Sequence, residues 1–393
     1  MLKIINGRII TPHRIIEGGS LYIRDGKIEA ITERDIQVSK RVKIIDARGL
    51  YVAPGFIDIH VHGGGGADFM DGTVEAFLQV AETHLRYGTT SMVPTTLTSD
   101  REQLLHTLAT YEQALSKNGK GAQLLGMHLE GPYFALNQRG AQDPRYIRDP
   151  DPAEYMEILQ QASLISRWSA APERKGAFVF GDALRSHGVL AAIAHTDAVY
   201  DDVLKAVEHG YTLATHLYSG MSGVTRRHAF RYAGVVESAL LLDEIDVEII
   251  ADGIHLPEAL LKLIYKIKGA SKIALITDAM RAAGTLVKTS MLGHKETGVS
   301  VIIEDGVAKL PDRTSFAGSI ATTDQLVRTM VNTAGVSMLE TIRMMSTTPA
   351  RIMGIQDHKG ALISGKDADV VIFDDQIHVA YTIMGGEVYW ERT

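Results

Sequence analysis

The 393-residue sequence contains no cysteine. This absence excludes a disulfide-stabilised scaffold, a thiolate zinc site, an iron–sulfur cluster and a cysteine nucleophile. Long apolar runs are also missing, because none approaches the length of about 18 residues that a membrane-spanning helix requires. The N-terminal segment alternates apolar and basic side chains and lacks the unbroken apolar stretch of a signal peptide. We therefore expect a cytoplasmic globular protein with no membrane partner.

Positive charge is in short supply. The chain has 40 Lys and Arg residues against 47 Asp and Glu residues, which gives a net charge of −7. Proteins that bind nucleic acid over a broad surface usually carry an excess of positive charge, so we expect no nucleic-acid partner. An anionic small molecule would need a local basic pocket.

The hydrophobic share of 45% is ordinary for a globular protein. The length fits one α/β barrel of about 250 residues plus a smaller unit.

Short strands are predicted at both ends of the chain. Near the N-terminus, two alternating segments flank the dipeptide Asp25-Gly26, which is a strong signal for a β-hairpin. Segments of the same kind occupy the C-terminal end, at residues 369–373, 379–384 and 387–390. We predict that the two ends together form one small β-sandwich domain, which comprises residues 1–53 and 352–393.

The middle of the chain, residues 54–351, follows a different pattern. Short apolar runs alternate with segments of helical period, and the runs lie at residues 56–62, 91–94, 123–130, 167–171, 189–195, 212–216, 247–251 and 273–277. Eight strands alternating with helices predict an α/β fold of the (β/α)8 TIM-barrel type, with a doubly wound sheet as the alternative. Two stretches interrupt the alternation, and we expect both to form loops over the active face, at residues 131–152 and 281–319.

Ionisable side chains gather at the ends of five of these eight strands. The first strand ends with His60 and His62, which share one face because side chains alternate along a strand. Later strands end with Glu130, His195, His216 and Asp278. In a barrel, the C-terminal ends of all strands open onto one mouth, so these side chains should converge there.

Each of these residues taken alone has a plain structural explanation, such as a hydrogen-bonded core histidine or a salt-bridged carboxylate. Their joint occurrence at strand ends predicts a metal site, because imidazole and carboxylate groups are ligands for divalent cations. His128 lies one pleat deeper than Glu130 on the same face, and we expect it to support the ligands from behind.

Six segments resemble the amidohydrolase superfamily and, within it, the N-acetylglucosamine-6-phosphate deacetylases. The first segment is Ala-Pro-Gly-Phe-Ile-Asp-Ile-His-Val-His at residues 53–62, and the second is His-Leu-Glu-Gly-Pro at residues 128–132. The others lie at residues 194–198, 214–218, 251–255 and 277–280. The H-x-H segment marks the superfamily, whereas His-Leu-Glu-Gly-Pro and Ala-Asp-Gly-x-His are more specific to the deacetylases.

The resemblance implies a role for each residue. Glu130, His195 and His216 match the metal ligands, and His60 and His62 imply a second ion that shares Glu130. The cofactor is then one or two divalent ions, Zn, Fe, Mn or Co, and Asp278 matches the catalytic acid and base. The positions that match the substrate-binding residues are Ala141, Gln142, Ser219, Gly220, Arg227, His255, Phe316, Ala317 and Gly318. Arg227 matches an arginine that reaches the phosphate in a neighbouring subunit, which implies a homodimer.

Two departures from the family pattern leave the identity of the sugar open. Ser219-Gly220-Met221 stands where the family usually has Asn-Ala-Met, and the Arg-Glu-Pro-Gly segment is replaced by residues 227–230, Arg-His-Ala-Phe. We expect hydrolysis of the N-acetyl group of N-acetylglucosamine 6-phosphate, with N-acetylgalactosamine 6-phosphate as the nearest alternative. A cyclic amidase would often use a carboxylated lysine, and no strand ends in Lys. An inactive scaffold would not need the full set of ligands.

Overall fold

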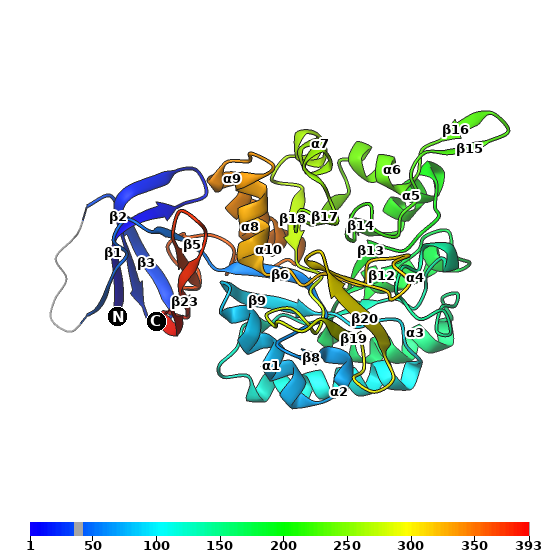
Figure 1. The fold of residues 1–393 in the computed structure, drawn as a ribbon, viewed down its shortest axis with the longest axis horizontal. Helices are drawn as coiled ribbons and strands as arrows, with labels where there is room; N and C mark the ends of the chain where they lie inside the picture. Colours follow the sequence, from blue (N-terminus) through cyan, green and yellow to red (C-terminus); the bar gives the residue numbers. More distant parts are fainter. Residues whose placement is uncertain (35–41, 393) are drawn as a thin grey trace.

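A computed structural model of the chain describes residues 1–34 and 42–392. Both ends of the chain lie in a β domain at one side of the molecule, and an α/β barrel forms the rest (Figure 1). The β domain is one mixed sheet with strand order β24-β23-β22-β5-β1-β2-β3, and β4 pairs with β1. Its strands are β1 (Leu2–Ile10), β2 (Ile15–Arg24), β3 (Lys27–Thr32), β4 (Lys43–Asp46), β5 (Tyr51–Pro54), β22 (Val370–Phe373), β23 (Val379–Met384) and β24 (Glu387–Glu391).

Strand β5 joins the two ends of the chain. It pairs in parallel with β1 on one side and antiparallel with β22 on the other. The predicted hairpin between β2 and β3 turns at Asp25 and Gly26, both with positive φ, as a tight two-residue turn requires. Buried residues such as Ile4, Leu21 and Ile372 form the core of the sheet. A β domain built from both ends is therefore confirmed, whereas the domain boundaries at 53/54 and 351/352 remain predictions.

The eight apolar runs of the middle segment form the parallel strands of the barrel. Hydrogen bonds order them as two sheets, which isolated bridges from Thr95 to His128 and from Val61 to Ala279 join into a closed ring. The strands are β6 (Phe56–Val61), β9 (Thr89–Pro94), β11 (Met127–Glu130), β12 (Ile165–Ala170), β13 (Leu190–Ile193), β14 (Tyr211–Ala214), β17 (Asp246–Ile250) and β18 (Ile273–Ile276). The predicted TIM-barrel architecture is confirmed.

Helices cover the outside of the barrel (Figure 1). Side-chain caps begin several of them: Thr73 accepts from the amide of Ala76, and Asp100 accepts from that of Gln103. The helices are α1 (Val74–Leu85), α2 (Arg101–Lys117), α3 (Pro152–Ile158), α4 (Ala177–Ser186), α5 (Tyr200–Glu208), α6 (Val235–Leu241), α7 (Glu258–Lys268), α8 (Thr323–Asn332), α9 (Met338–Ile342) and α10 (Thr348–Ile352). None of these helices in the described part of the chain has the length and apolarity to cross a bilayer.

The remaining strands are short, and all except β10, which pairs in parallel with β9 of the barrel, lie outside the barrel and the terminal sheet. β19, β20 and β21 form a three-stranded antiparallel sheet, hereafter the flap sheet, whose second turn is at Asp305 and Gly306. β15 and β16 form a hairpin that projects from the barrel at the opposite end from the terminal domain (Figure 1). The bounds are β7 (Gly63–Gly64), β8 (Ala67–Asp68), β10 (Gln123–Leu124), β15 (Thr225–Arg227), β16 (Phe230–Tyr232), β19 (Thr289–Leu292), β20 (Val299–Glu304) and β21 (Val307–Lys309).

Candidate metal centre and substrate cavity

Three of the predicted site residues occupy equivalent places in the barrel. His195, His216 and Asp278 each follow the last residue of a barrel strand by two positions, after β13, β14 and β18. All three have left-handed backbones, with φ values of 45°, 35° and 48°. This conformation costs a non-glycine residue about 1–2 kcal/mol, and such residues concentrate at functional sites. The turn after each strand therefore aims a polar side chain into the barrel mouth at some cost in stability.

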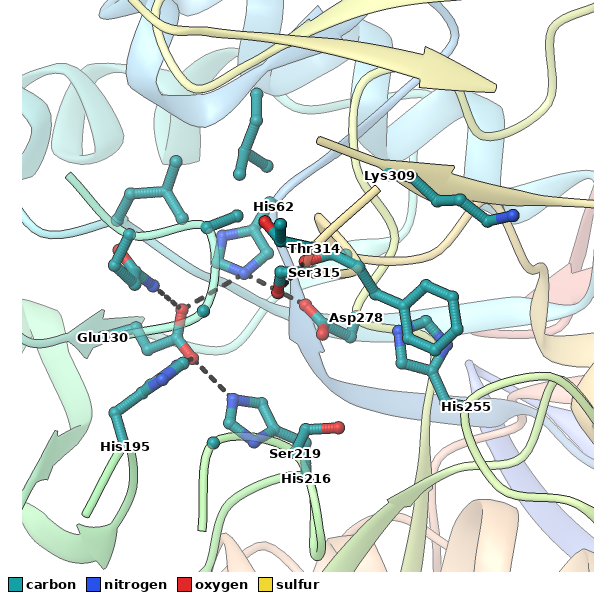
Figure 2. A pocket seen from close by; sticks show the side chains of 18 of the residues that line it. His62, Glu130, His195, His216, Ser219, His255, Asp278, Lys309, Thr314 and Ser315 are labelled. Carbon is teal, nitrogen blue, oxygen red and sulfur yellow. Dashed lines mark hydrogen bonds and ion pairs between the residues drawn. The ribbon is translucent and has the colours of Figure 1, made fainter. Parts of the chain in front are cut away.

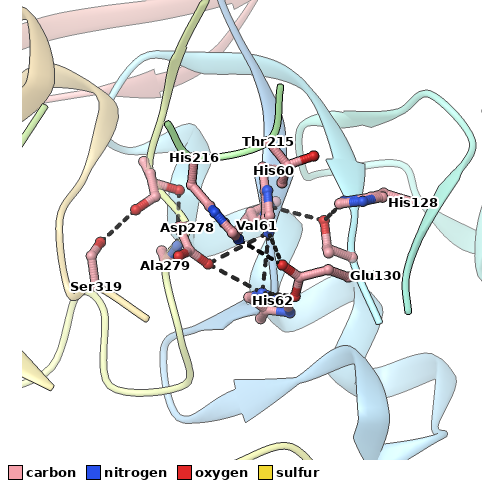
Figure 3. A network of polar contacts seen from close by, with 12 residues as sticks. His60, Val61, His62, His128, Glu130, Thr215, His216, Asp278, Ala279 and Ser319 are labelled. Carbon is pink, nitrogen blue, oxygen red and sulfur yellow. Dashed lines mark hydrogen bonds and ion pairs between the residues drawn. The ribbon is translucent and has the colours of Figure 1, made fainter. Parts of the chain in front are cut away.

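Glu130, at the end of β11, is the centre of the polar cluster (Figure 3). Its Oε1 lies 2.9 Å from His216 Nε2 and 3.3 Å from His195 Nε2. Its Oε2 lies 3.4 Å from His62 Nε2 and accepts a 2.7 Å hydrogen bond from Gln142 Nε2. One carboxylate thus contacts imidazoles from three different strand ends, which the sequence separates by more than 150 positions.

Asp278 closes the cluster on its other side. Its Oδ1 lies 3.1 Å from His62 Nε2 and 3.5 Å from His60 Nε2. The Nε2 atoms of His60 and His62 are 3.3 Å apart. Two sets of side chains have ligand atoms close enough to hold one ion each, His60 with His62 and Asp278, and His60 with Glu130 and His216. The structure therefore brings together all the predicted metal ligands and the predicted catalytic carboxylate.

The protonation of the cluster reflects this crowding of opposite charges. Burial favours the neutral form of Glu130, but His60 and the close contacts with the imidazoles of His195 and His216 outweigh it and hold the pKa well below its ordinary value. The pKa of Asp278 is lowered in the same way, because His60 and His62 outweigh its burial. For His62, burial opposes the charged form, yet contacts with Asp278 and Glu130 raise its pKa to about 10. The cluster thus presents its carboxylates as anions, and positive charge close to them stabilises this state.

The hydrogen bonds of His195 indicate whether a cation can lie between this residue and Glu130. Its Nδ1 lies 2.7 Å from the Gln138 carbonyl oxygen and must carry the proton that this oxygen accepts. A neutral His195 then turns the lone pair of Nε2 toward Glu130 Oε1, which is itself an acceptor. Two facing acceptors are stabilised when a cation lies between them. Nitrogen and oxygen donors of this kind suit Zn, Fe, Mn or Co. The buried His, Glu and Asp groups therefore fit a divalent-metal site of the type that amidohydrolases contain.

A second layer of buried polar groups supports the histidines from the barrel interior. Glu248 on β17 lies 3.4 Å from His60 Nδ1 and forms an ion pair with Arg167 on β12. His128 contacts Ser169 Oγ at 2.6 Å and packs edge-on against the His60 ring. His128 therefore lies behind the ligands, as expected from its position in the strand. Sequence reasoning missed Arg167 and Glu248, because each lies inside an apolar strand and gains its role only from a partner across the barrel.

A cavity of about 610 Å³ opens above the cluster (Figure 2). His60 lies beneath it, and the other predicted ligands and Asp278 line it. Of the predicted substrate-binding residues, seven line the cavity: Ala141, Gln142, Ser219, Gly220, His255, Phe316 and Gly318. Ala317 is buried between two lining residues, and Arg227 lies on β15 of the projecting hairpin, outside this set. The loop at residues 131–152 and the flap sheet both contribute to the wall, as predicted for loops over the active face.

His255 holds a fixed orientation at the cavity wall. Its Nδ1 lies 2.7 Å from Asp252 Oδ2, and the other oxygen of Asp252 accepts from the amides of Ile254 and His255, each at 2.8 Å. The His255 ring packs against Phe316 with 4.6 Å between the ring centres. The Ala-Asp-Gly-x-His segment thus forms a turn in which the aspartate orients the histidine. Sequence reasoning missed other lining residues, among them Tyr218, Lys309, Arg313, Thr314 and Ser315.

A barrel whose mouth carries converging histidines and acidic groups defines a class, the metal-dependent hydrolases of the TIM-barrel type. A family model for the amidohydrolase family matches residues 51–389, and the chain belongs to this family.

Two curated relatives cover nearly the whole chain. The N-acetylglucosamine-6-phosphate deacetylase of Lysinibacillus sphaericus is 34% identical over 94% of this chain and 92% of that protein. The N-acetylgalactosamine-6-phosphate deacetylase of Escherichia coli O157:H7 is also 34% identical, over 97% of each chain.

Solved structures of such deacetylases share the fold of this chain. The N-acetylglucosamine-6-phosphate deacetylase of Pasteurella multocida superimposes with a TM-score of 0.92 at 29% identity, over the full length of both chains. A variant of the enzyme from Mycobacterium smegmatis, solved in complex with N-acetyl-D-glucosamine-6-phosphate, gives a TM-score of 0.90 at 29% identity over 99% of both chains. The predicted membership of the amidohydrolase superfamily is confirmed, and the chain resembles deacetylases of amino-sugar phosphates.

Proposed function

We propose that the protein hydrolyses the N-acetyl group of an N-acetylhexosamine 6-phosphate, N-acetylglucosamine 6-phosphate in the first place, to give the amino sugar and acetate. The position of Asp278 carries this proposal. It contacts His60 and His62 in the buried cluster and also lines the cavity, so a substrate amide beside the cluster lies within its reach. Likeness to deacetylases over nearly the whole chain supports the same reaction.

One or two divalent cations would be held by His60, His62, Glu130, His195 and His216, with Glu130 available to both. A bound cation supplies two kinds of chemistry, a lowered pKa for water and a polarised substrate carbonyl. The side chains around the site do the rest. Gln142 is fixed by its bonds to Glu130 and to the Thr98 amide, and its second N–H remains free to donate to the carbonyl oxygen. His255, oriented by Asp252, is the other candidate donor.

Asp278 moves the proton. Its lowered pKa makes it a carboxylate, so it can accept a proton from the attacking water. It then donates this proton to the nitrogen of the departing amine. An amine is a poor leaving group unless it is protonated, so a single group that first accepts and then donates is sufficient for the whole reaction. Two protons from two separate acids are not required.

The phosphate is proposed to meet Arg227 of a second copy of the chain. The β15–β16 hairpin that carries Arg227 projects from the barrel (Figure 1), and Phe230 near its tip is 72% exposed. A basic hairpin with an exposed aromatic side chain suits contact with another subunit. We therefore propose a homodimer in which each hairpin approaches the cavity of the other copy.

The epimer of the sugar is a separate question. Relatives named for glucosamine and for galactosamine substrates are equally similar to this chain, at 34% identity. The residues that replace the usual family pattern, Ser219 and Gly220, line the cavity. N-acetylgalactosamine 6-phosphate is therefore the second candidate substrate.

Acetate release tests the proposal. Purified protein whose metal content has been measured is incubated with N-acetylglucosamine 6-phosphate, N-acetylgalactosamine 6-phosphate, the two free sugars and dihydroorotate. Fast acetate release from a phosphorylated sugar supports the proposal, and the faster of the two identifies the epimer. Equal rates on free and phosphorylated sugars would contradict the phosphate requirement, and opening of dihydroorotate without acetate release would favour a cyclic amidase.

A further inference from the structure

The cavity contains two cationic side chains that the proposed function does not use. Lys309, at the end of β21, and Arg313, four residues later, are the only Lys or Arg residues among the described residues that line it. The metal cluster occupies one side of the cavity, and Lys309 lies at the upper right of the view in Figure 2, away from Glu130 and His195 at the left. An elongated ligand with its amide at the cluster would place its far end near Lys309.

The backbone holds Arg313 at the rim of the cavity. The turn from Leu310 to Ser315 closes with a 3.0 Å bond between the Leu310 amide and the Ser315 carbonyl oxygen. Arg313 lies inside this turn with a left-handed backbone, at a φ of 60°. A long side chain rarely adopts this conformation, and such residues concentrate at ligand-binding segments.

Acidic neighbours neutralise the two cations but leave hydrogen-bond donors free. Lys309 Nζ lies 2.6 Å from Asp305 Oδ2 and 3.3 Å from Glu304 Oε1. Arg313 forks onto Glu304 through Nε at 2.8 Å and Nη2 at 3.2 Å. An ammonium group has three donors and a guanidinium has five. Within the described part of the chain, one N–H of Lys309 and three of Arg313 therefore remain without an acceptor, while the two positive and two negative charges cancel.

We propose that Lys309 and Arg313 form an anion-binding subsite within each chain that contacts the phosphate group of the substrate. The subsite rests on the proposed function, because it takes the phosphate of a sugar whose amide lies at the metal cluster. A phosphate dianion has several strong acceptor oxygens, which match the free donors on the two side chains. The subsite acts from the flap sheet of the same chain, in addition to Arg227 of a second copy.

Glu304 gives the subsite a distinctive signature. It bonds both cations, so its carboxylate opposes an incoming phosphate. Glu304→Gln removes this negative charge and frees donors on both cations, and should therefore strengthen binding of a phosphorylated ligand. A purely structural role for the three residues predicts the opposite, because the same substitution would then loosen the flap sheet and weaken binding.

The experiment compares five proteins loaded with metal: wild type, Lys309→Met, Arg313→Met, Glu304→Gln and the control Lys288→Met. Lys288 directly precedes strand β19 of the flap sheet and is outside the set that lines the cavity. For each protein, kcat/KM is measured with N-acetylglucosamine 6-phosphate and with N-acetylglucosamine. The same measurement is made with N-acetylgalactosamine 6-phosphate and with N-acetylgalactosamine. Calorimetry measures binding of glucosamine 6-phosphate and of glucosamine to the same proteins.

We expect the preference for the phosphorylated sugar to fall about 10-fold in each Met variant, which is the size of one charge-assisted hydrogen bond. It should rise several-fold in Glu304→Gln and stay unchanged in Lys288→Met. An unchanged preference in both Met variants, or a fall in Glu304→Gln, would overturn the subsite. A protein that releases no acetate would refute the proposed function alone, because the binding preference measured by calorimetry still decides the subsite.

Discussion

The buried pair of Arg167 and Glu248 provides the sharpest test of how the barrel supports its site. Both side chains are 0% exposed. Arg167 forks onto the Glu248 carboxylate and also donates to the Ile59 carbonyl oxygen at 3.1 Å and to Thr215 Oγ1 at 3.2 Å. Burial would raise the pKa of Glu248, but the charge of Arg167 outweighs it, so the carboxylate stays ionised. Each charge is therefore tolerated only because the other is present.

Arg167→Met should destabilise the protein by about 3–5 kcal/mol at neutral pH, because it leaves the Glu248 carboxylate buried and uncompensated. The loss should shrink as the pH falls. Without Arg167, burial raises the pKa of Glu248, so the carboxyl group takes up a proton and the uncompensated charge disappears. Adding Glu248→Leu should restore most of the loss, since removal of both charges costs far less than removal of one.

Urea denaturation of the metal-free proteins, followed by circular dichroism, measures these differences. The matched control is Arg185→Met, which breaks an exposed pair with Asp182 and should cost less than about 1 kcal/mol. The double variant should also bind metal about 10–100-fold more weakly, because His60 loses the partner of its Nδ1. The reasoning is wrong if Arg167→Met costs no more than the control, or if adding Glu248→Leu deepens the loss.

Three further predictions concern the reaction, the metal and the pH dependence of stability. Asp278→Asn should lower kcat by ~10²–10⁴-fold, with the metal content measured on the same sample, and retention of more than about a tenth of wild-type turnover contradicts its role. Chelation should abolish acetate release and lower the melting temperature, because a cation that binds only the folded state stabilises it; activity that survives in metal-free protein counts against the site. Burial opposes ionisation of Asp71, but bonds from Arg281 at 2.7 Å outweigh it and lower its pKa. The stability this pair contributes is complete above the unfolded-state pKa of about 4 and is lost as the pH falls through the lower folded value. The gap in unfolding free energy between wild type and Asp71→Asn should therefore be constant above about pH 5 and narrow as the pH falls below about 4. A gap of constant size would show that Asp71 is not the titrating group.

The chemistry-bearing residues could be predicted from the sequence because of a simple geometric rule. Parallel strands of a barrel all end at one face, so a polar residue just after each apolar run must point to the same mouth. His195, His216 and Asp278 obey this rule with the same offset of two positions after the strand. The rule needs only local patterns, and the local apolar runs are strong in this chain.

Contacts between side chains on distant strands of the barrel could not be predicted from the local sequence pattern. Arg167 and Glu248 are separated by 81 positions in the sequence. They lie on β12 and β17, and two strands, β13 and β14, lie between these in the barrel. A charged residue inside an apolar run could equally mark a strand end or an edge. Only the closed ring of strands shows that the two side chains meet in the interior, where a lone charge would be very costly.

The flap sheet shows a different limit. The sequence indicates its turn at Asp305 and Gly306, because that dipeptide strongly favours a hairpin. It does not show that the segment folds back over the mouth, since this depends on tertiary contacts such as the bridge between Lys309 and Phe316. From the sequence alone, Lys309 and Arg313 would be interpreted as charged surface residues. In the structure, both line the cavity.

The residues of the polar cluster and the other residues that line the cavity lie on different parts of the fold. The predicted ligands and Asp278 lie at the ends of barrel strands, where the hydrogen-bonded ring fixes their positions. The residues that face the rest of the cavity lie on loops and on the flap sheet. Loops accept substitution more readily than strands, because fewer packed neighbours constrain them. We therefore expect substitutions at Ser219, Gly220, Lys309 or Arg313 to change the sugar or anion that is bound while the cluster around Glu130 stays intact.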